Sequence, residues 1–294
     1  YVRWTERRNA KSFLKLIDTG KINPSILTTH KFSIENAMSA YDLVSKDNKE
    51  SIIGVLINYN TEKKIQSNIQ LKKHVTSDSN KINLGIIGTG NFAKSVLLPS
   101  MYNTKGFNFY AVSSNKGISS KMIAEKYNAT VVYDDPIKLI NDKNINALLI
   151  ATRHNSHAEY VIEALRLNKH VFVEKPLAIS SLQLENIKKT FNKTKGTLSV
   201  GYNRRYSDQI LDLKDFFAGR KNPIAMMYRI NAGFISEKSV SSWVHDKEIG
   251  GGRIIGEACH FIDVFQFLCD SNPVSLDVIK IGNSKFEDTV SFTM

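Results

Sequence analysis

The sequence predicts an α/β fold built on a doubly wound parallel sheet, and two observations carry that prediction. From residue 82 onward, short apolar runs alternate with amphipathic stretches, which is the pattern of repeated βαβ units. A glycine-rich turn lies between the first apolar run and the stretch that follows it. Beyond residue 200 the alternation gives way to longer loops and one strongly apolar helix at 253–269, which predicts a second domain of different architecture.

The elements of the first domain can be placed by residue range. Strands are expected at 84–87, 107–112, 130–133, 147–151 and 171–174. Helices are expected at 92–102, 118–127, 136–141 and 156–168. A further helix begins at Ser181, because Ser180 and Gln183 have the spacing of a capping box. We therefore assign residues 82–200 to this domain and residues 201–294 to the second, which we expect to be truncated.

The segment before residue 82 has a different character. Helical patterns run over 9–19 and about 34–44, the second after Ser33 as a candidate cap, and 51–57 predicts a buried strand. Residues 1–60 are too few for an independent core, and the polar residues 61–81 predict a linker. The chain starts without methionine and stops within an expected strand at 289–294, so we expect a fragment of a longer polypeptide.

Composition narrows the class of protein. With 294 residues, 42% hydrophobic and 23% charged, the chain has enough apolar residues for a globular core, which excludes a disordered chain. Its two cysteines, Cys259 and Cys269, are too few for a disulfide framework, which predicts a cytoplasmic protein. No apolar run approaches the roughly 18 residues that a membrane span needs. The net charge of +12 is spread along the chain, so we expect no nucleic-acid or membrane partner, although anionic small molecules would be attracted.

The glycine-rich turn has the spacing of a phosphate-binding loop. Its six residues, in the pattern G-x-G-x-x-A, are Gly88, Thr89, Gly90, Asn91, Phe92 and Ala93. Gly88 permits the tight turn, Gly90 lets backbone amides approach a pyrophosphate, and Ala93 lets the helix pack closely on the sheet. The N-terminus of that helix adds partial positive charge. The loop therefore predicts a dinucleotide-binding Rossmann domain, with NAD or NADP as the cofactor.

The end of the second strand bears on the choice between these cofactors. An acidic residue there would bind the adenosine ribose of NAD, but the chain has Ser113, Ser114, Asn115 and Lys116. Without a carboxylate to repel a 2′-phosphate, and with Lys116 nearby, NADP is acceptable. Lys116 is equally well explained as a solvated loop lysine, so the choice stays open.

Two later segments carry residues suited to hydride-transfer chemistry. Lys175 follows a buried strand and precedes Pro176, which holds its backbone extended, and an amine there can stabilise a developing alkoxide. Glu257 and His260 lie one turn apart on the helix that follows the glycines at 250–252. A neutral histidine is the natural base for an alcohol proton. The alternative interpretations are that Lys175 is an ordinary surface lysine and that His260 is a histidine packed in the core.

Four segments together make a resemblance specific. The loop at 88–93, Glu174-Lys175-Pro176, residues 201–206 and the glycine-led helix with His260 have the order and spacing of the Gfo/Idh/MocA oxidoreductases, over about residues 82–294. The resemblance implies a Rossmann domain followed by an α/β domain with an open, mostly antiparallel sheet, and a cis peptide before Pro176. It also implies that substrate and nicotinamide meet at the domain junction, and that hydride is transferred to or from a sugar or cyclitol.

The resemblance also implies roles for individual residues. Lys175 would orient the hydroxyl and His260 would act as the acid and base. Glu257, which the family pattern does not supply, is a third candidate catalytic residue. Further cofactor contacts are expected from Ser114, Lys116, Thr152, Arg153, His157, Glu174 and Lys175, and substrate contacts from Tyr202, Asn203, Arg204 and Trp243. We expect a homo-oligomer.

Two positions depart from the family pattern. The family usually has an aspartate four residues before the histidine, where this chain has Gly256, and Glu257 is the candidate replacement. The family commonly has Thr-Pro after the fourth strand, where this chain has Thr152-Arg153. Arg153 would narrow the nicotinamide pocket or bind an anionic group of the substrate. His154 and His157 suggest a metal pair, but no further ligands complete a site, so no metal is expected.

The sequence thus predicts an NAD(P)-dependent oxidoreductase that acts on a hydroxyl-bearing carbon of a sugar, such as a nucleotide sugar or sugar acid. The alternatives are a redox-cycling glycosidase that retains NAD and a non-catalytic regulator that senses the cofactor. Residues 13–22 and 29–37 resemble the C-terminal end of medium-chain, zinc-type alcohol dehydrogenases. That second resemblance covers only a tail and implies a fusion of two dehydrogenase types.

Overall fold

The computed structural model divides the chain into two compact units, Tyr1–Gln66 and Ser67–Met294. It describes residues 4–45, 51–60, 68–72, 81–104, 106–114, 117–282, 285–286 and 288–294.

The first unit is small and largely exposed. Its elements are α1 (Glu6–Asp18), β1 (His30–Ser33), α2 (Ala37–Ser45) and β2 (Val55–Asn58), with short 3₁₀ turns at Pro24–Leu27 and Ile34–Asn36. β1 and β2 pair in parallel, and Ala40 alone is buried among the residues described in this unit. The buried strand expected at 51–57 is therefore wrong in its burial, because β2 alternates half-buried and exposed side chains. Ser33 makes no side-chain capping bond, whereas Thr5 caps α1 through Arg8 N.

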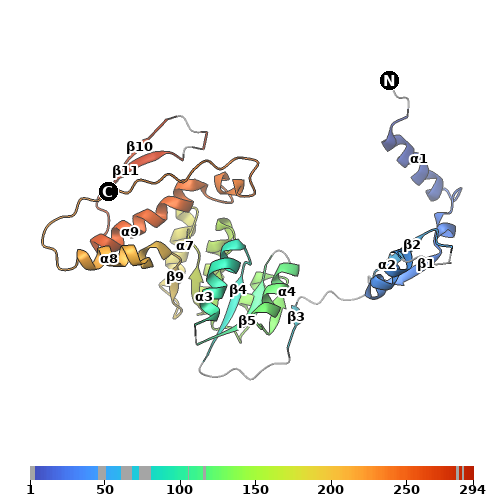
Figure 1. Cartoon of the computed structure of the whole chain (residues 1–294), viewed down its shortest axis with the longest axis horizontal. Helices are drawn as coiled ribbons and strands as arrows, with labels where there is room; N and C mark the ends of the chain where they lie inside the picture. The colour runs from blue at the N-terminus through green and yellow to red at the C-terminus, as the bar shows by residue number, and fades with distance from the viewer. Residues whose placement is uncertain are drawn as a thin grey trace. The chain divides into compact units, whose positions relative to one another are not determined.

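The second unit is built on a seven-stranded sheet in the order β3-β6-β5-β4-β7-β8-β9. Figure 1 labels β3, β4, β5 and β9 of this sheet. The strands are β3 (Asn68–Gln70), β4 (Ile82–Ile87), β5 (Phe107–Ser113), β6 (Val131–Tyr133), β7 (Ala147–Ile150), β8 (His170–Val173) and β9 (Leu198–Val200). All neighbouring pairs are parallel except β3 with β6. The doubly wound parallel sheet is confirmed. β3 lies within the segment expected to be only a linker, so part of 61–81 belongs to the sheet.

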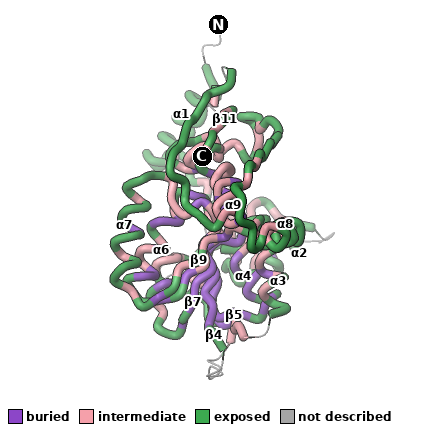
Figure 2. The backbone as a smooth tube through the Cα atoms, turned by 90° about the vertical axis from the view of Figure 1, so that its left-hand side faces the viewer, coloured by how far each residue is buried: buried purple, intermediate pink, exposed green. Residues whose placement is uncertain are grey.

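Two apolar layers cover the sheet because side chains along a strand alternate between its faces. On β4, Leu84 and Ile86 belong to one buried cluster and Ile87 to the other. The first cluster includes side chains of α3 (Leu98–Tyr102) and α4 (Gly117–Lys126). The second includes α5 (Pro136–Ile140), α6 (His157–Arg166) and α7 (Ser181–Phe191). In Figure 2 the strands β4, β5 and β7 form the most continuously buried part of this unit.

Local signals in the sequence account for several helix boundaries. Ser180 Oγ accepts from Gln183 N at 3.3 Å, and Gln183 Oε1 accepts from Ile179 N at 2.9 Å, so α7 starts at its expected cap. Two helices differ from expectation because each begins with a π turn, at Ala93–Leu97 and at Ile254–Ala258. Such turns widen the helix and often lie at functional sites. Here one follows the glycine loop and the other precedes His260.

After β9 the chain is mostly helix and irregular backbone. Its elements are a 3₁₀ turn (Asn203–Tyr206), α8 (Asp208–Phe216), a 3₁₀ turn (Ser242–His245), α9 (Cys259–Cys269), β10 (Asp277–Lys280) and β11 (Val290–Thr293). β10 and β11 pair antiparallel, and in the described part of this segment they are the whole second sheet. The open, larger antiparallel sheet implied by the resemblance is therefore represented by this one hairpin.

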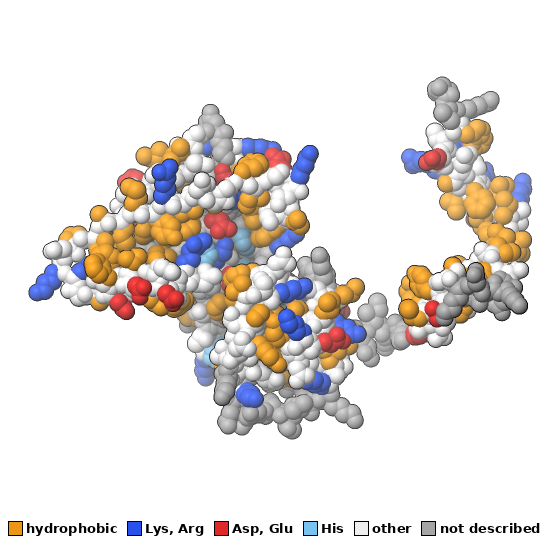
Figure 3. Space-filling model, in the orientation of Figure 1, with side chains coloured by type: hydrophobic (Ala, Val, Ile, Leu, Met, Phe, Trp, Pro, Cys, Tyr) orange, Lys and Arg blue, Asp and Glu red, His pale blue; other side chains and the backbone are white. Residues whose placement is uncertain are grey.

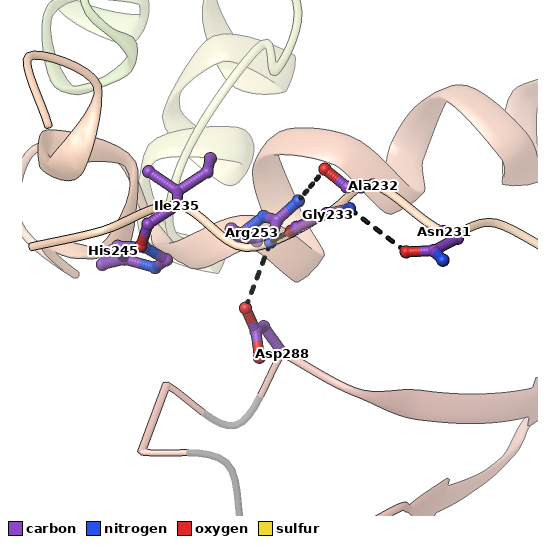
Figure 4. A network of polar contacts seen from close by, with 7 residues as sticks. All are labelled: Asn231, Ala232, Gly233, Ile235, His245, Arg253 and Asp288. Atoms are coloured by element: carbon purple, nitrogen blue, oxygen red, sulfur yellow. Dashed lines mark hydrogen bonds and ion pairs between the residues drawn. The ribbon is translucent and has the colours of Figure 1, made fainter.

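Arg253 holds the irregular segment together. Its guanidinium donates to the carbonyls of Gly233 at 2.8 Å and Ala232 at 3.3 Å, and it pairs with Asp288 at 3.4 Å (Figure 4). The side chains of both ion-pair partners are largely buried, at 12% and 14% exposed. These bonds take the place of strand pairing, because they satisfy carbonyls of a segment that is irregular in the described structure.

None of the described helices is long and apolar enough to cross a membrane.

Candidate functional site

The glycine loop lies where the strand order reverses, between β4 and β7. Gly88 adopts a φ of +96°, and its amide donates to the Ser113 carbonyl at 2.9 Å. A Cβ at Gly88 would lie 2.4 Å from the carbonyl oxygen of Ala151, just after β7. Only glycine fits there, so the loop after β4 packs directly on the loop after β7. In open α/β sheets the crevice at this reversal is where ligands bind.

Gly90, unlike Gly88, lies next to open space. A Cβ there would meet no described atom within 4 Å, and the Gly90 carbonyl accepts from Lys94 N at 3.0 Å as the helical segment begins. Ala93 is buried against the sheet, whereas Asn91 and Phe92 are exposed. The open space beside Gly90 and the backbone amides of the first helical turn fit the pyrophosphate of a dinucleotide.

The end of β5 is lined by hydroxyl groups. Ser114 Oγ lies 2.6 Å from Ser120 Oγ, and Thr89 Oγ1 lies 3.0 Å from Ser119 Oγ. Ser113 Oγ is buried and makes no hydrogen bond in the described part of the chain. Asn115 and Lys116 lie outside the described residues. The residues that are described here accept either a ribose or a phosphate group, because hydroxyls donate as well as accept.

The loop after β7 begins with Thr152, whose Oγ1 lies 2.7 Å from Ser156 Oγ. Arg153 is exposed, and its guanidinium lies over the ring of Trp243 at 5.6 Å. His157, which we expected to bind the cofactor, is fully buried, with Nδ1 2.8 Å from the Pro176 carbonyl and Nε2 3.2 Å from the Thr152 carbonyl. Burial lowers its pKa. This expectation is corrected: the ring is occupied in joining two loops and has no surface for a cofactor.

Lys175 is held at the carboxyl end of β8. Its ammonium donates to the Gly256 carbonyl at 2.7 Å and lies 3.6 Å from Glu257 Oε1, and its side chain is 15% exposed. The cis peptide before Pro176 is present, as the resemblance implied. Glu174 lies against Gly201, whose Cβ would be 2.6 Å from Glu174 Oε1, and burial raises the pKa of that carboxyl. The amine is thus aimed across to the helix that carries His260.

His260 is buried on α9, and its Nδ1 has no hydrogen-bond partner among the described residues. Burial, followed by the positive charges of Lys175 and Arg204, lowers the pKa of His260 to about 4. The ring is therefore neutral at neutral pH and able to accept a proton. Tyr202 meets it edge-on with ring centroids 6.2 Å apart, and burial raises the pKa of Tyr202 to about 12.

An ion pair that sequence reasoning missed supports this arrangement. Arg205 Nε donates to Asp263 Oδ2 at 2.8 Å, and a second guanidinium nitrogen donates to Asp263 Oδ1. Asp263 is buried one turn after His260, so the pair ties the turn that follows Tyr202 to α9. Arg204 next to it is exposed and lies over Phe261 at 4.8 Å. A bidentate arginine on a buried carboxylate fixes geometry, but nothing in the spacing of the two residues marks them as partners.

The structure brings five of the seven expected catalytic and substrate residues to one place. The contacts described above link five residues: Lys175, Glu257, His260, Tyr202 and Arg204. A separate pair, Arg153 and Trp243, lies beside the loop after β7. Figure 3 shows histidine, basic and acidic side chains gathered where the Rossmann part and the segment after residue 200 meet. Asn203 is exposed, and no contact to a described side chain assigns it to the site. Among the described residues, no group of three histidine, cysteine or carboxylate side chains is placed to hold a metal ion.

The lowered pKa of His260 predicts how stability depends on pH. Its pKa is about 4 in the fold against 6.5 for the free side chain, so between these values the unfolded chain binds more protons. The contribution to stability is complete above pH 6.5 and is lost as the pH falls toward 4. We expect that in His260→Asn the free energy of unfolding, measured with urea, falls less steeply between pH 6.5 and pH 4. An unchanged slope would show that the ring is not buried in its neutral form.

Fold and site together define a dinucleotide-binding protein of the Rossmann class, with an amine after β8 and a buried histidine on α9. Comparison with known families agrees: residues 82–202 match the Gfo/Idh/MocA model, described as an oxidoreductase family with an NAD-binding Rossmann fold. The matched residues are those that carry β4 to β9 of the second unit.

Relatives and solved structures give the same fold. The chain is 30% identical over 132 residues to the myo-inositol 2-dehydrogenase of Thermotoga maritima, covering 45% of this chain and 39% of that protein. It is 27% identical to the inositol 2-dehydrogenase of Serratia proteamaculans, covering 67% and 57%. The structure of Lactobacillus casei myo-inositol dehydrogenase with NAD(H) and myo-inositol aligns with a TM-score of 0.56 and 22% identity, over 70% of this chain and 59% of that one. The chain thus spans between 39% and 59% of the length of these proteins.

Proposed function

We propose that the protein is an NAD(P)-dependent oxidoreductase that moves a hydride to or from a hydroxyl-bearing carbon of a sugar or cyclitol. The observation that carries the proposal is the Lys175 ammonium, held by the Gly256 carbonyl 2.7 Å away and placed beside the neutral ring of His260. The names of the relatives, which are inositol dehydrogenases, support the same class of reaction.

The roles of the residues follow from their surroundings. The loop at 88–93 would hold the pyrophosphate, and a bound nicotinamide would supply or accept the hydride. Lys175 has further N–H donors besides the one given to Gly256, and these would orient a substrate hydroxyl and stabilise negative charge on its oxygen. His260 would accept the hydroxyl proton, since its ring is neutral and its Nδ1 lacks a partner among the described residues. Glu257, 3.6 Å from Lys175, would help to fix the amine.

We further propose that the substrate carries an anionic group, as a sugar acid or nucleotide sugar does. Arg153 and Arg204 are both exposed, and each guanidinium lies over an aromatic ring and has N–H groups that can donate to an anionic group. Trp243 and Tyr202 offer ring faces and edges for the sugar itself. The overall charge of +12 favours the approach of such a molecule.

Ser114 should influence the choice between NADP and NAD. A carboxylate in its place would repel the 2′-phosphate of NADPH and accept hydrogen bonds from the ribose of NADH. We expect Ser114→Asp to weaken NADPH binding about tenfold relative to NADH, because a like charge at contact distance opposes the phosphate. Nicotinamide fluorescence titrations measure both affinities. The matched neutral variant Ser114→Asn should leave the ratio nearly unchanged, and an unaltered ratio in Ser114→Asp would remove Ser114 from cofactor selection.

The proposed activity is tested by titrating the protein with NADH and NADPH and then screening sugars. Myo-inositol, sugar acids and nucleotide sugars would each be added with the oxidised cofactor while nicotinamide absorbance is followed. Net reduction that depends on the sugar supports the oxidoreductase. Cleavage of a glycoside without net cofactor change would replace it by the redox-cycling glycosidase, and cofactor binding without any turnover would favour the regulator.

We also propose that residues 1–60 come from the end of a medium-chain dehydrogenase fused to the second unit, in a cytoplasmic protein. The contact pattern supports a separate origin, since this segment falls into its own compact unit. α1 leaves Phe13, Leu14 and Leu16 exposed, which is expected of a helix that belongs against a larger core.

A further inference from the structure

His154 is held rigidly by contacts that the proposed reaction does not use. Its side chain is buried in the turn after β7, and Nδ1 lies 2.8 Å from the Gly250 carbonyl. A carbonyl can only accept, so Nδ1 carries the proton and Nε2 is the unprotonated nitrogen. The ring of Trp243 packs against it at a steep angle, with centroids 4.8 Å apart and the ring planes at 77°. Next to it, Asn155 N donates to the Ile249 carbonyl at 3.0 Å, which fastens the same two segments a second time.

The ring of His154 fills the space that a side chain at position 256 would need. A Cβ at Gly256 would lie 3.0 Å from His154 Cε1 and 3.5 Å from Nδ1. Gly256 has no positive φ, so its backbone conformation does not require glycine. A side chain at this buried position in the π turn would therefore have to displace the imidazole by a few tenths of an ångström.

Gly256 also holds Lys175, because its carbonyl accepts from the ammonium at 2.7 Å. One continuous set of contacts therefore runs from the β7 loop through the His154 ring to Gly256, and from the Gly256 carbonyl to the Lys175 amine. Burial, followed by the nearby charges of His157 and Lys175, lowers the pKa of His154 to about 4. A neutral ring can pack beside the ammonium without repelling it.

We propose that His154 is a positioning residue for Lys175: by packing on Gly256 it fixes the carbonyl that holds the amine. The consequence for catalysis rests on the function proposed above, whereas the mechanical link between the ring and the amine does not. The contact between His154 and Gly256 also explains how the site packs without a side chain at position 256. The His154 ring, from the loop after β7, occupies the space that such a side chain would fill.

The experiment is a double-mutant cycle of Gly256→Ala and His154→Ala with two readouts. The first is the rate at which acetic anhydride acylates Lys175, followed by mass spectrometry of the peptide, which needs no turnover. The second is kcat and KM with the sugar found in the screen. We expect each single variant to change the acylation rate at least about threefold, and Gly256→Ala to lower kcat about tenfold with KM for the cofactor unchanged, because a small displacement of a positioned group is costly.

The double variant decides between the proposal and two independent effects. Removing the ring makes room for the methyl group that Gly256→Ala adds, so the double variant should change the acylation rate and kcat by less than the product of the single changes. Single effects that simply multiply would overturn the proposal. If no variant oxidises a sugar, the proposed function fails, but the acylation cycle still decides whether His154 positions the amine.

Control variants separate positioning from general damage. Gly117→Ala is the control for the glycine, since its Cβ would meet no described atom within 4 Å, and His170→Ala is the control for an exposed histidine. If Gly256→Ala does not fold, His154→Asn replaces it, because Asn retains a donor for the Gly250 carbonyl but lacks the ring edge that meets Gly256. A Lys175 acylation rate in His154→Asn and His154→Ala equal to that of His170→Ala would refute the proposal.

Discussion

Lys175→Ala is expected to lower kcat at least about a hundredfold with the sugar substrate, since one positioned donor at a developing oxyanion contributes on that scale. Lys175 joins the Rossmann part to the helical segment of His260, through the Gly256 carbonyl at 2.7 Å and Glu257 at 3.6 Å. Loss of the amine removes the donor for the substrate oxygen and leaves the cofactor loop at 88–93 intact. The affinity for NADH or NADPH should therefore fall much less than kcat, by no more than the loss of one contact, and kcat/KM for the sugar should fall with kcat.

The matched control for this variant is Lys189→Ala, an exposed lysine near the end of α7. It removes the same charge from the same unit and should leave turnover and cofactor affinity as they are. Turnover of Lys175→Ala within about threefold of the unmodified protein would exclude the amine from the reaction, because even one lost charged hydrogen bond costs more.

Gly88→Ala is expected to destabilise the second unit by roughly 3 kcal/mol or more, and to abolish measurable cofactor binding. Two causes add at this position. The φ of +96° is strained for any residue with a Cβ, and the new methyl would lie 2.4 Å from the Ala151 carbonyl oxygen. That oxygen belongs to the backbone, so the clash is relieved only by separating the loops after β4 and β7. Urea unfolding measures the stability, and nicotinamide fluorescence measures binding.

Gly90→Ala is the matched control for Gly88→Ala, because it adds the same methyl group to the same loop without a clash. Its Cβ meets no described atom within 4 Å, so we expect stability within about 1 kcal/mol of the unmodified protein. Binding of NADH and NADPH should nevertheless weaken, since the methyl occupies the space through which the pyrophosphate approaches the backbone. Equal stability losses in the two variants would contradict the packing described for Gly88.

Features that depend on neighbouring residues could be predicted from the sequence. The alternation of apolar runs and amphipathic stretches after residue 82 predicted the parallel sheet, because the periods of strands and helices are local properties of the chain. Gly88 and Ser180 were placed correctly in their turn and cap for the same reason. A turn with a left-handed φ and a capped helix amide each depend only on residues a few positions away. Pattern also predicted Lys175 just after a strand and His260 on a helix, and these elements are β8 and α9.

Only the tertiary structure decided which distant side chains meet. His157 was expected at the cofactor and is instead buried between two backbone carbonyls. The strand at 51–57 was expected to be buried, and β2 instead alternates half-buried and exposed side chains. His154 binds Gly250 across 96 residues of chain, and Arg205 binds Asp263 across 58. Periodicity determines which face of an element is apolar, but it carries no information about which elements pack together. Such pairs arise when the sheet and its connecting loops close on each other, so they are fixed by packing rather than by spacing along the chain.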